Sequence, residues 1–447
     1  MSINKNITSK NVLFRGPKAH KGEIFHSDMA ESIMAERSFL TLSDTKQVLC
    51  YDESAGIYKF DGEIIIEQLA QFWLGRAGLD AKATTHYMEQ VIDFIRRETY
   101  IDRDALNPNP SILVVKNGTL SLIAGTLVKH SKAFKATIAI PVTYDVNAKC
   151  PVIDKFLSEI VAPSDLPLLC EIPAWCLTTR SGIQRLVLLL GEGRNGKTKY
   201  LEMLREFLGR GNCTAHTLQS LTTNRFAVAG LFGKLANIAP DLPSRALREA
   251  GPLKTLTGSD TVEAEKKFKD SFNFINSAKM VFATNTPPEI TEDTYAVWRR
   301  IVMVDFPYKF EGKNEDKNIL SKITTEQELS GFLNLVLKGL ERINTNGDFT
   351  YSRTIENTRS RYLLMSNPTQ TFIDDFCELD AWSTITKEEL YQGFMKFCEE
   401  NKLPGIAKKA FGHKVKQMYM LTEEHDKWRG IKIMWRGASA KSGTKNK

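Results

Sequence analysis

The sequence predicts an α/β protein organised around a strand, a glycine-rich loop and a helix, and three observations lead to that class. Residues 186–190 form a short, continuous apolar run, which is typical of a strand buried on both faces. The glycine-rich stretch 191–198 follows at once, and apolar side chains then recur at helical spacing up to Leu208. Two further apolar runs, at residues 234–241 and 279–285, predict additional strands of the same sheet.

The glycine-rich stretch fits G-x-x-x-x-G-K-[ST] at every fixed position. Glycines let the backbone wrap a phosphate, and the loop N–H groups with the helix N-terminus then face the anion. Lys197 would neutralise β- and γ-phosphate charge, and Thr198 would bind Mg²⁺. A chance match on an ordinary turn is the alternative, but the flanking strand and helix favour a nucleotide site. The expected nucleotide-binding residues are Gly191, Glu192, Gly193, Arg194, Asn195, Gly196, Lys197 and Thr198.

Length and composition narrow the class of protein. A chain of 447 residues predicts about two to four domains, and the net charge of +7 permits nucleic acid without demanding it. Seven cysteines are scattered without a C-x-x-C pair, which argues against zinc ribbons and a disulfide framework and favours a reducing compartment. No apolar run reaches membrane-spanning length, and residues 1–10 lack a signal-peptide core, so we expect a cytoplasmic protein without a membrane partner.

The region before the loop predicts an α+β domain. Residues 48–60 and 111–122 each read as a hairpin, with helices at 64–76 and 84–98 between them. Asp102-Arg103-Asp104 could be compared with the D-x-D metal site of a primase, but the Asn-Pro repeat that follows indicates a solvated turn. Residues 151–179 read as helical, broken into short pieces at Pro163, Pro167 and Pro173.

Polar residues at strand ends beyond the loop suggest the rest of a nucleotide site. Asp241 could hold the water shell of Mg²⁺, and Asn285 could orient the attacking water or contact the γ-phosphate. Arg299 and Arg300 precede another apolar run at 301–304, where an arginine could reach the γ-phosphate bound by a neighbouring subunit.

The order and spacing of these pieces resemble the superfamily 3 helicases, within them the phage/plasmid and poxvirus-type primase-helicase family. The resemblance implies an AAA+ fold, and a hexameric ring that unwinds replicating DNA with ATP and Mg²⁺ in a prokaryotic or viral-host cytoplasm. Carried over by position, it assigns Lys197 and Thr198 to motif A, Asp241 to motif B, Asn285 to motif C and an arginine finger to Arg299 or Arg300, with a slight preference for Arg300. The family often ends motif B with two acids, so the single Asp241 leaves open which group polarises water. The stretches that carry the resemblance are 191–198, 233–234 with 241–243, 256–260, 282–285, 298–300 with 305–307 and, upstream, 116–120 and 141–145.

A basic segment at residues 263–269 lies between motifs B and C. Hexameric helicases of this kind insert a basic hairpin into the central channel, which would bring Lys266, Lys267 and Lys269 to DNA phosphates. Phe268 could stack on a base or pack the hairpin. The alternative is an ordinary solvated charged face.

The last part of the chain predicts a small basic domain. Helices are expected at 319–344 and 353–365, then at 371–379 and, after the capping box Thr386-x-x-Glu389, at 390–400. A basic helix at 407–418 and a strand pair at 428–435 complete the order of a winged helix-turn-helix. A basic cap that contacts another subunit or protein is the rival interpretation. The DNA-contact candidates on the basic helix are Lys408, Lys409 and Lys414.

We therefore expect an ATP-dependent replicative DNA helicase of a virus, plasmid or provirus. The alternatives are a non-helicase AAA+ ATPase and a replication initiator switched by ATP. Single-stranded and forked DNA, further copies of the chain in a homo-hexamer, and other replication proteins are the expected partners. A primase activity is not expected. The predicted parts are an N-terminal α+β domain at 1–135, a helical collar at 136–179, the AAA+ core at 180–310, its helical continuation at 311–370 and a winged-helix domain with a basic tail at 371–447.

Overall fold

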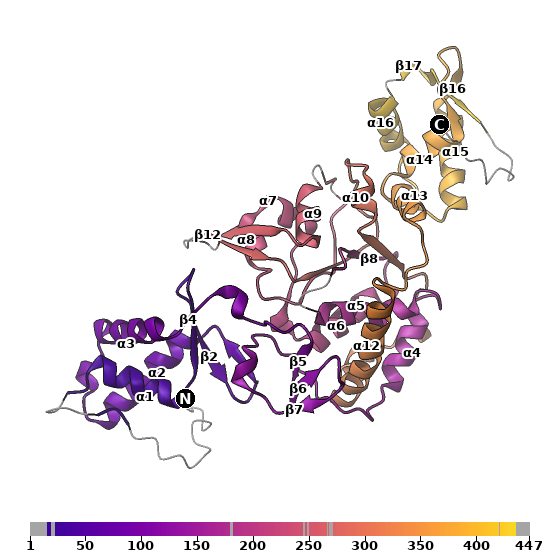
Figure 1. Ribbon diagram of the computed structural model, residues 1–447. Helices are drawn as coiled ribbons and strands as arrows, with labels where there is room; N and C mark the ends of the chain where they lie inside the picture. Colours follow the sequence, from indigo (N-terminus) through magenta and orange to yellow (C-terminus); the bar gives the residue numbers. More distant parts are fainter. Residues whose placement is uncertain are drawn as a thin grey trace.

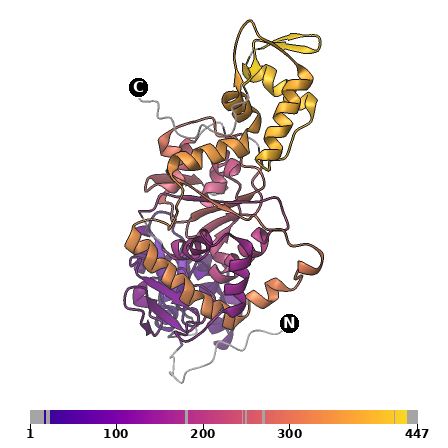
Figure 2. The same cartoon turned by 90° about the vertical axis from the view of Figure 1, so that its right-hand side faces the viewer.

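The computed structural model describes residues 16–18, 23–178, 182–244, 246–247, 250–265, 267, 271–419 and 421–434. Figure 1 shows an N-terminal α+β region, a central sheet with its helices, and a C-terminal domain at the opposite end. In the view turned by 90° the C-terminal domain, in yellow, projects from one end of the molecule (Figure 2). Among the described helices, none combines the length and apolar composition that crossing a lipid bilayer requires.

The centre of the molecule is a five-stranded parallel sheet in the order β14-β8-β13-β10-β9. All of β8 is buried, as the apolar run predicted. Side chains alternate along a strand. Accordingly, Leu186, Leu188 and Leu190 join one hydrophobic core, while Val187 and Leu189 join the other. The elements are β8 (Leu186–Leu190), α6 (Lys197–Leu208), β9 (Cys213–Thr214), α7 (Leu218–Thr223), α8 (Arg225–Ala229), β10 (Ala236–Ala239), α9 (Gly251–Thr257), β11 (Thr261–Glu265), β12 (Ser271–Ile275), β13 (Lys279–Thr284), α10 (Tyr295–Trp298) and β14 (Ile301–Asp305).

Two helices, α4 (Pro151–Ile160) and α5 (Leu166–Leu177), lie in the region predicted to be a helical collar. The prediction that Pro167 and Pro173 would break it is wrong. Pro167 lies in the first turn of α5, where a backbone N–H is not needed. Pro173 lies inside α5 and removes the donor for the Leu169 carbonyl, which instead accepts a hydrogen bond from Tyr200 Oη at 3.0 Å. A tertiary contact thus satisfies the acceptor that the proline would leave open.

The N-terminal region is the α+β domain that the sequence predicted. Its four-stranded sheet has the order β3-β2-β1-β4, and a separate antiparallel sheet, β5-β6-β7, leads towards the collar. Both predicted hairpins are confirmed as antiparallel pairs, β2 with β3 and β5 with β6. The elements are α1 (His26–Glu36), β1 (Phe39–Leu42), β2 (Val48–Asp52), β3 (Ile57–Lys59), α2 (Gly62–Arg76), α3 (Thr85–Glu98), β4 (Tyr100–Ile101), β5 (Ile112–Val115), β6 (Gly118–Ser121) and β7 (Leu127–Val128).

The C-terminal part differs from the prediction in three places. The expected helix at 319–344 is two helices, because the Thr325 side chain caps a new helix by accepting from the Glu328 N–H. The helix predicted at 371–379 lies about three residues earlier, because α14 begins at Pro368 and ends at Phe376. The strand pair predicted within 428–435 is wrong, because the two strands there pair with other segments. Residues 427–429 pair with residues 422–424, and residues 432–433 pair with residues 377–378. Trp435 lies outside the described residues.

The capping box is confirmed, with the Thr386 and Glu389 side chains each accepting from the other residue's backbone N–H. The order of elements from α14 to β18 is one helix, two strands, two helices and a hairpin. They are α11 (Ile319–Ile323), α12 (Glu326–Asn346), α13 (Ile355–Ser366), α14 (Pro368–Phe376), β15 (Cys377–Glu378), β16 (Thr384–Thr386), α15 (Lys387–Glu400), α16 (Lys408–Tyr419), β17 (Thr422–Glu424), β18 (Lys427–Arg429) and β19 (Lys432–Ile433).

Candidate functional site

The loop at residues 191–196 connects β8 to α6, as the sequence predicted. Gly196 has a φ of +87° and precedes the first helical residue. A Cβ at this position would lie 2.6 Å from Ile160 Cγ2 of the collar. Only glycine therefore allows both the left-handed backbone and the close approach of α4. Gly193 also has a positive φ, +97°, but it faces open space.

Lys197 lies buried at the start of α6, with its ammonium turned back over the loop. Its Nζ donates to the Gly191 carbonyl and, at 3.4 Å, to Asn285 Oδ1. Burial lowers the pKa of Lys197 to about 8. Two residues that the sequence placed in one site, from motif A and motif C, are thus in contact.

A segment after β14 packs along the loop, and the sequence did not indicate its role. The Phe306 N–H donates to the Leu190 carbonyl at 2.8 Å, and the Phe310 N–H donates to the Arg194 carbonyl at 2.8 Å. Buried Asn195 donates from Nδ2 to the Phe306 carbonyl at 3.3 Å. The one signal for this contact in the sequence was Asn195, an amide at a variable position of the motif.

The parallel register gathers the strand ends at one edge of the sheet. Thr284 of β13 pairs with Leu190, so that Asn285 follows beside the loop. On the next strand, the Leu242 N–H donates to the Ala283 carbonyl at 2.9 Å, which holds Asp241 beside the end of β13. Asp241 and Thr198 are both exposed. Their carboxylate and hydroxyl oxygens are the hard donors that Mg²⁺ prefers, so the residues fit that ion.

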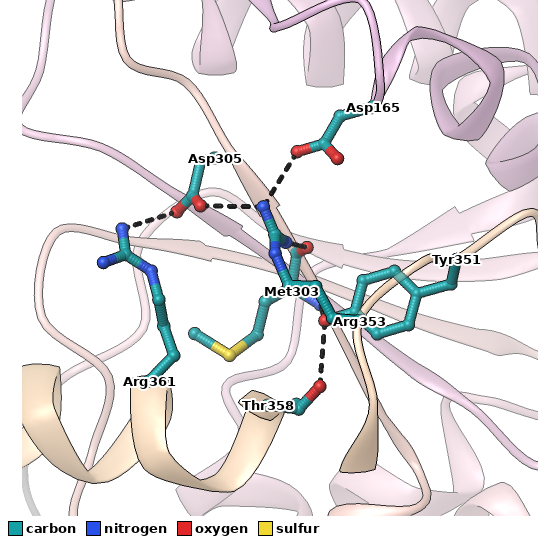
Figure 3. Close-up of polar contacts among 7 residues, drawn as sticks. All are labelled: Asp165, Met303, Asp305, Tyr351, Arg353, Thr358 and Arg361. Atoms are coloured by element: carbon teal, nitrogen blue, oxygen red, sulfur yellow. Dashed lines mark hydrogen bonds and ion pairs between the residues drawn. The ribbon is translucent and has the colours of Figure 1, made fainter. Parts of the chain in front are cut away.

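A polar network joins the end of β14 to the start of α5 and to the segment from Arg353 to Arg361, which includes part of α13 (Figure 3). Arg353 Nη2 donates to Asp305 Oδ2 at 3.0 Å and to Asp165 Oδ2 at 3.2 Å, and Arg361 donates to Asp305 Oδ1 at 3.3 Å. Burial alone would lower the pKa of Arg353, but the charge of Asp305 and the other acceptors raises it overall. Asp305 immediately precedes Phe306, so this network holds the segment that packs along the loop. The sequence analysis placed Asp305 in a stretch that carries the family resemblance, but it assigned no role to any member of this network.

Arg299 and Arg300 lie at the opposite edge of the sheet from the loop. The strand that follows them pairs Ile301 with Leu186, the first residue of β8, so the loop is roughly 15 Å farther along the strand. Arg300 is buried and donates to Thr257 Oγ1 at 3.1 Å, the Ala296 carbonyl at 2.6 Å and Gln184 Oε1 at 3.0 Å. Burial and the charge of Arg299 lower its pKa. Arg299 is half-buried and donates to Gln184 Oε1 at 2.6 Å.

The basic segment between motifs B and C forms an antiparallel hairpin, with β11 and β12 paired from Thr261 with Ile275 to Glu265 with Ser271. Lys267 lies in the turn at its tip. Lys266, Phe268 and Lys269 lie outside the described residues. The hairpin itself is therefore confirmed, whereas the contacts expected of its tip stay a prediction.

The basic helix is confirmed as α16. Lys408 pairs with Glu388, and Lys414 lies 3.5 Å from Glu289 of the central region. Lys409 is exposed on the same helix. Because ion pairs at a surface contribute little, these pairings leave the lysines able to exchange to other anions.

Comparison with known proteins divides the chain into two matched regions. Residues 39–162 match the family model described as D5 N terminal like, and residues 189–300 match a family of unknown function, DUF5906. A protein named "Putative helicase" from Acanthamoeba polyphaga mimivirus is 24% identical over 250 residues, which cover 51% of this chain. Together, these matches support a phage or viral primase-helicase family of the superfamily 3 type. The chain spans 26% of the length of the mimivirus relative.

Among solved structures, the chain is similar to the NrS-1 C-terminal region, with a TM-score of 0.48 at 10% identity, covering 91% of this chain and 99% of that chain. The JCV helicase matches with a TM-score of 0.29 at 12% identity, over 48% of this chain and 64% of that chain.

Alanine at Gly196 should destabilise the protein more than alanine at Gly193. Both substitutions strain a left-handed residue, but only the Gly196→Ala methyl group meets Ile160, at a cost of about 1–3 kcal/mol. Thermal unfolding without nucleotide measures the difference, with Gly193→Ala as the matched control. Equal unfolding midpoints for the two variants would contradict this account of the loop packing.

Proposed function

We propose that the protein is an ATP-driven DNA helicase that works as a ring of identical subunits. The observation that carries the proposal is the meeting of Lys197, Asn285 and Asp241 at one edge of the parallel sheet. Triphosphate hydrolysis needs groups of these three kinds at one point. The match to the model described as D5 N terminal like and the name of the mimivirus relative support the same activity.

Each residue of the site would have its own role towards the nucleotide. Backbone N–H groups of residues 191–196 and the Lys197 ammonium bind the phosphates. Thr198 and Asp241 would hold Mg²⁺, which neutralises charge that develops on the phosphates during transfer. Asn285 now accepts a hydrogen bond from Lys197 and would turn to the γ-phosphate or the attacking water when a nucleotide enters. Asp241 is the acid best situated to activate that water, because it ends the strand beside Asn285.

The arginine finger would come from a second subunit. Neither Arg299 nor Arg300 can reach the loop of its own chain, since the length of β8 separates them. Arg299 is the better finger, because Arg300 already donates three hydrogen bonds within its own subunit. This ranking reverses the slight preference for Arg300 drawn from the resemblance.

DNA would meet two surfaces. The β11–β12 hairpin would contact a single strand through Lys267 and, beyond the described residues, Lys266 and Lys269. The C-terminal domain would contact duplex DNA through α16, where Lys409 and His413 are exposed. The acidic Glu423 and Glu424 on β17 weaken the case for a wing that binds phosphate.

A remodelling ATPase without helicase activity and an initiator switched by ATP are the alternatives. The hairpin between motifs B and C favours the helicase over the remodelling ATPase. An initiator would bind duplex DNA yet leave a fork intact.

Lys267→Ala should abolish unwinding of forked DNA while basal ATP hydrolysis stays within about twofold, because the tip contacts DNA and not nucleotide. Strand displacement and ATP turnover are measured side by side on the full chain. Lys322→Ala, which removes an exposed lysine paired with Asp316 on another face, is the matched control. Unwinding by Lys267→Ala at the wild-type rate would remove the hairpin from the mechanism.

Nucleotide affinity should fall as the pH rises above about 8. Burial keeps the pKa of Lys197 near 8 in the free protein, and a bound phosphate favours the charged ammonium. Binding therefore takes up a proton above that pH, and affinity decreases by up to about tenfold per pH unit until the pKa of the complex is reached. Calorimetric titration checks this, with Lys197→Arg as the control that stays charged. An affinity that does not vary with pH in the wild type would count against the buried ammonium as the phosphate ligand.

Mixing two inactive variants should restore part of the ATPase activity. Arg299→Ala protein keeps an intact loop, and Lys197→Ala protein keeps an intact arginine, so mixed rings contain some complete interfaces. Turnover of the mixture above the sum of the separate variants is the expected result. Arg300→Ala should instead lower the unfolding temperature, because it removes a buried hydrogen-bonded group. Failure of both arginine variants to complement would refute action across a subunit boundary.

A further inference from the structure

Arg103 lies in the turn 102–104 that the sequence set aside as solvated, yet its side chain is only 11% exposed. Its Nε donates to Asp44 Oδ2 at 2.7 Å and its Nη2 to Asp44 Oδ1 at 3.0 Å. Burial would raise the pKa of Asp44, but the hydrogen bonds and charge of Arg103 outweigh burial and lower it. The guanidinium is thus held in a two-point contact by its own domain.

The same guanidinium also packs against the central region. Its carbon lies 4.3 Å from the centre of the Phe232 ring and 4.8 Å from that of Phe272. Phe232 packs edge-on against Phe272 and Phe274, with ring centres 5.7 and 5.6 Å apart, and against Phe60 of the N-terminal domain at 6.4 Å. Phe272 and Phe274 belong to β12, the second strand of the hairpin that carries Lys267.

The hairpin needs such a support. A two-stranded antiparallel pair is marginally stable by itself in water. One of its faces, with Val262, Ala264, Phe272 and Phe274, is buried, while the other is exposed. The aromatic group around Phe232 covers part of the buried face, and Arg103 joins that group to the N-terminal domain. Figure 1 shows the N-terminal domain on the side of the sheet from which β12 projects.

Arginine is the side chain suited to this double contact. Its planar guanidinium can present its edge to a carboxylate and its faces to aromatic rings at the same time. A lysine ammonium has no such plane, so it could keep the charge but not both contacts.

We propose that Arg103 is a positioning residue through which the N-terminal domain sets the orientation of the β11–β12 hairpin. The hairpin tip then presents Lys267 to a single strand, a step that rests on the proposed function. The domain before the motor would thereby govern how strongly DNA is coupled to hydrolysis, without contacting nucleotide or DNA through Arg103 itself.

The test compares Arg103→Ala with Arg96→Ala in the full-length protein. Arg96 is a matched control, because it also bridges two acids, Glu63 and Asp93, but both lie in the N-terminal domain. Hydrogen exchange without DNA should become about tenfold faster at residues 261–265 and 271–275 in Arg103→Ala and should not change there in Arg96→Ala. The oligothymidylate concentration for half-maximal ATPase stimulation should rise about tenfold in Arg103→Ala, with basal hydrolysis within about twofold of wild type.

Arg103→Lys is the second variant, and the same measurements are made on it if the alanine variant does not fold. It should show faster exchange in the hairpin despite keeping the charge. Hairpin exchange in Arg103→Lys and Arg103→Ala equal to that of Arg96→Ala would overturn the positioning role, as would unchanged DNA stimulation. If oligothymidylate did not stimulate ATP hydrolysis by the wild-type protein, that result would contradict the proposed function. The hydrogen-exchange rates of the hairpin would still test the positioning role of Arg103.

Discussion

The parallel pairing of β8 with its neighbours is the constraint on which the candidate site depends. Because β8, β13 and β10 run in the same direction, their carboxyl ends share one edge of the sheet. Residues that are far apart in the sequence, Lys197 and Asn285, therefore come within hydrogen-bonding distance. An antiparallel strand at either position would carry its polar end to the other edge. The burial of β8 in two hydrophobic cores stabilises this arrangement.

Residues from other segments stabilise the loop at residues 191–196, in addition to its own glycines. The segment that begins at Phe306 binds the loop backbone, and Asp305 just before it is bound by Arg353 and Arg361. Arg361 lies on α13, which leads directly into α14 of the C-terminal domain. A continuous set of contacts thus joins the loop at residues 191–196 to the part of the chain that carries the basic helix. Such a set of contacts is a physical route by which the two regions could influence each other.

The N-terminal domain also contacts the central region, through Arg103 and Phe232. The two matched family models are separate along the chain, at residues 39–162 and 189–300, yet Arg103 and Phe232 bring the matched regions into contact. The hairpin lies at this junction, so the same aromatic group supports both the domain contact and the strand pair.

The sequence by itself determined the loop, the strands that end in Asp241 and Asn285, the hairpin between them and the capping box at Thr386, because each depends on local spacing and on residue chemistry. It also carried the resemblance to the primase-helicase family that the matched regions support. The tertiary structure decided what local rules cannot: α5 continues through Pro173, since Tyr200 satisfies the open carbonyl, and Arg103 is buried rather than solvated, since rings from another region cover it. Arg300 likewise donates to two acceptors from separate segments, Thr257 and Gln184. Partners that are distant along the chain set the environment of these residues, and their spacing in sequence carries no record of that contact.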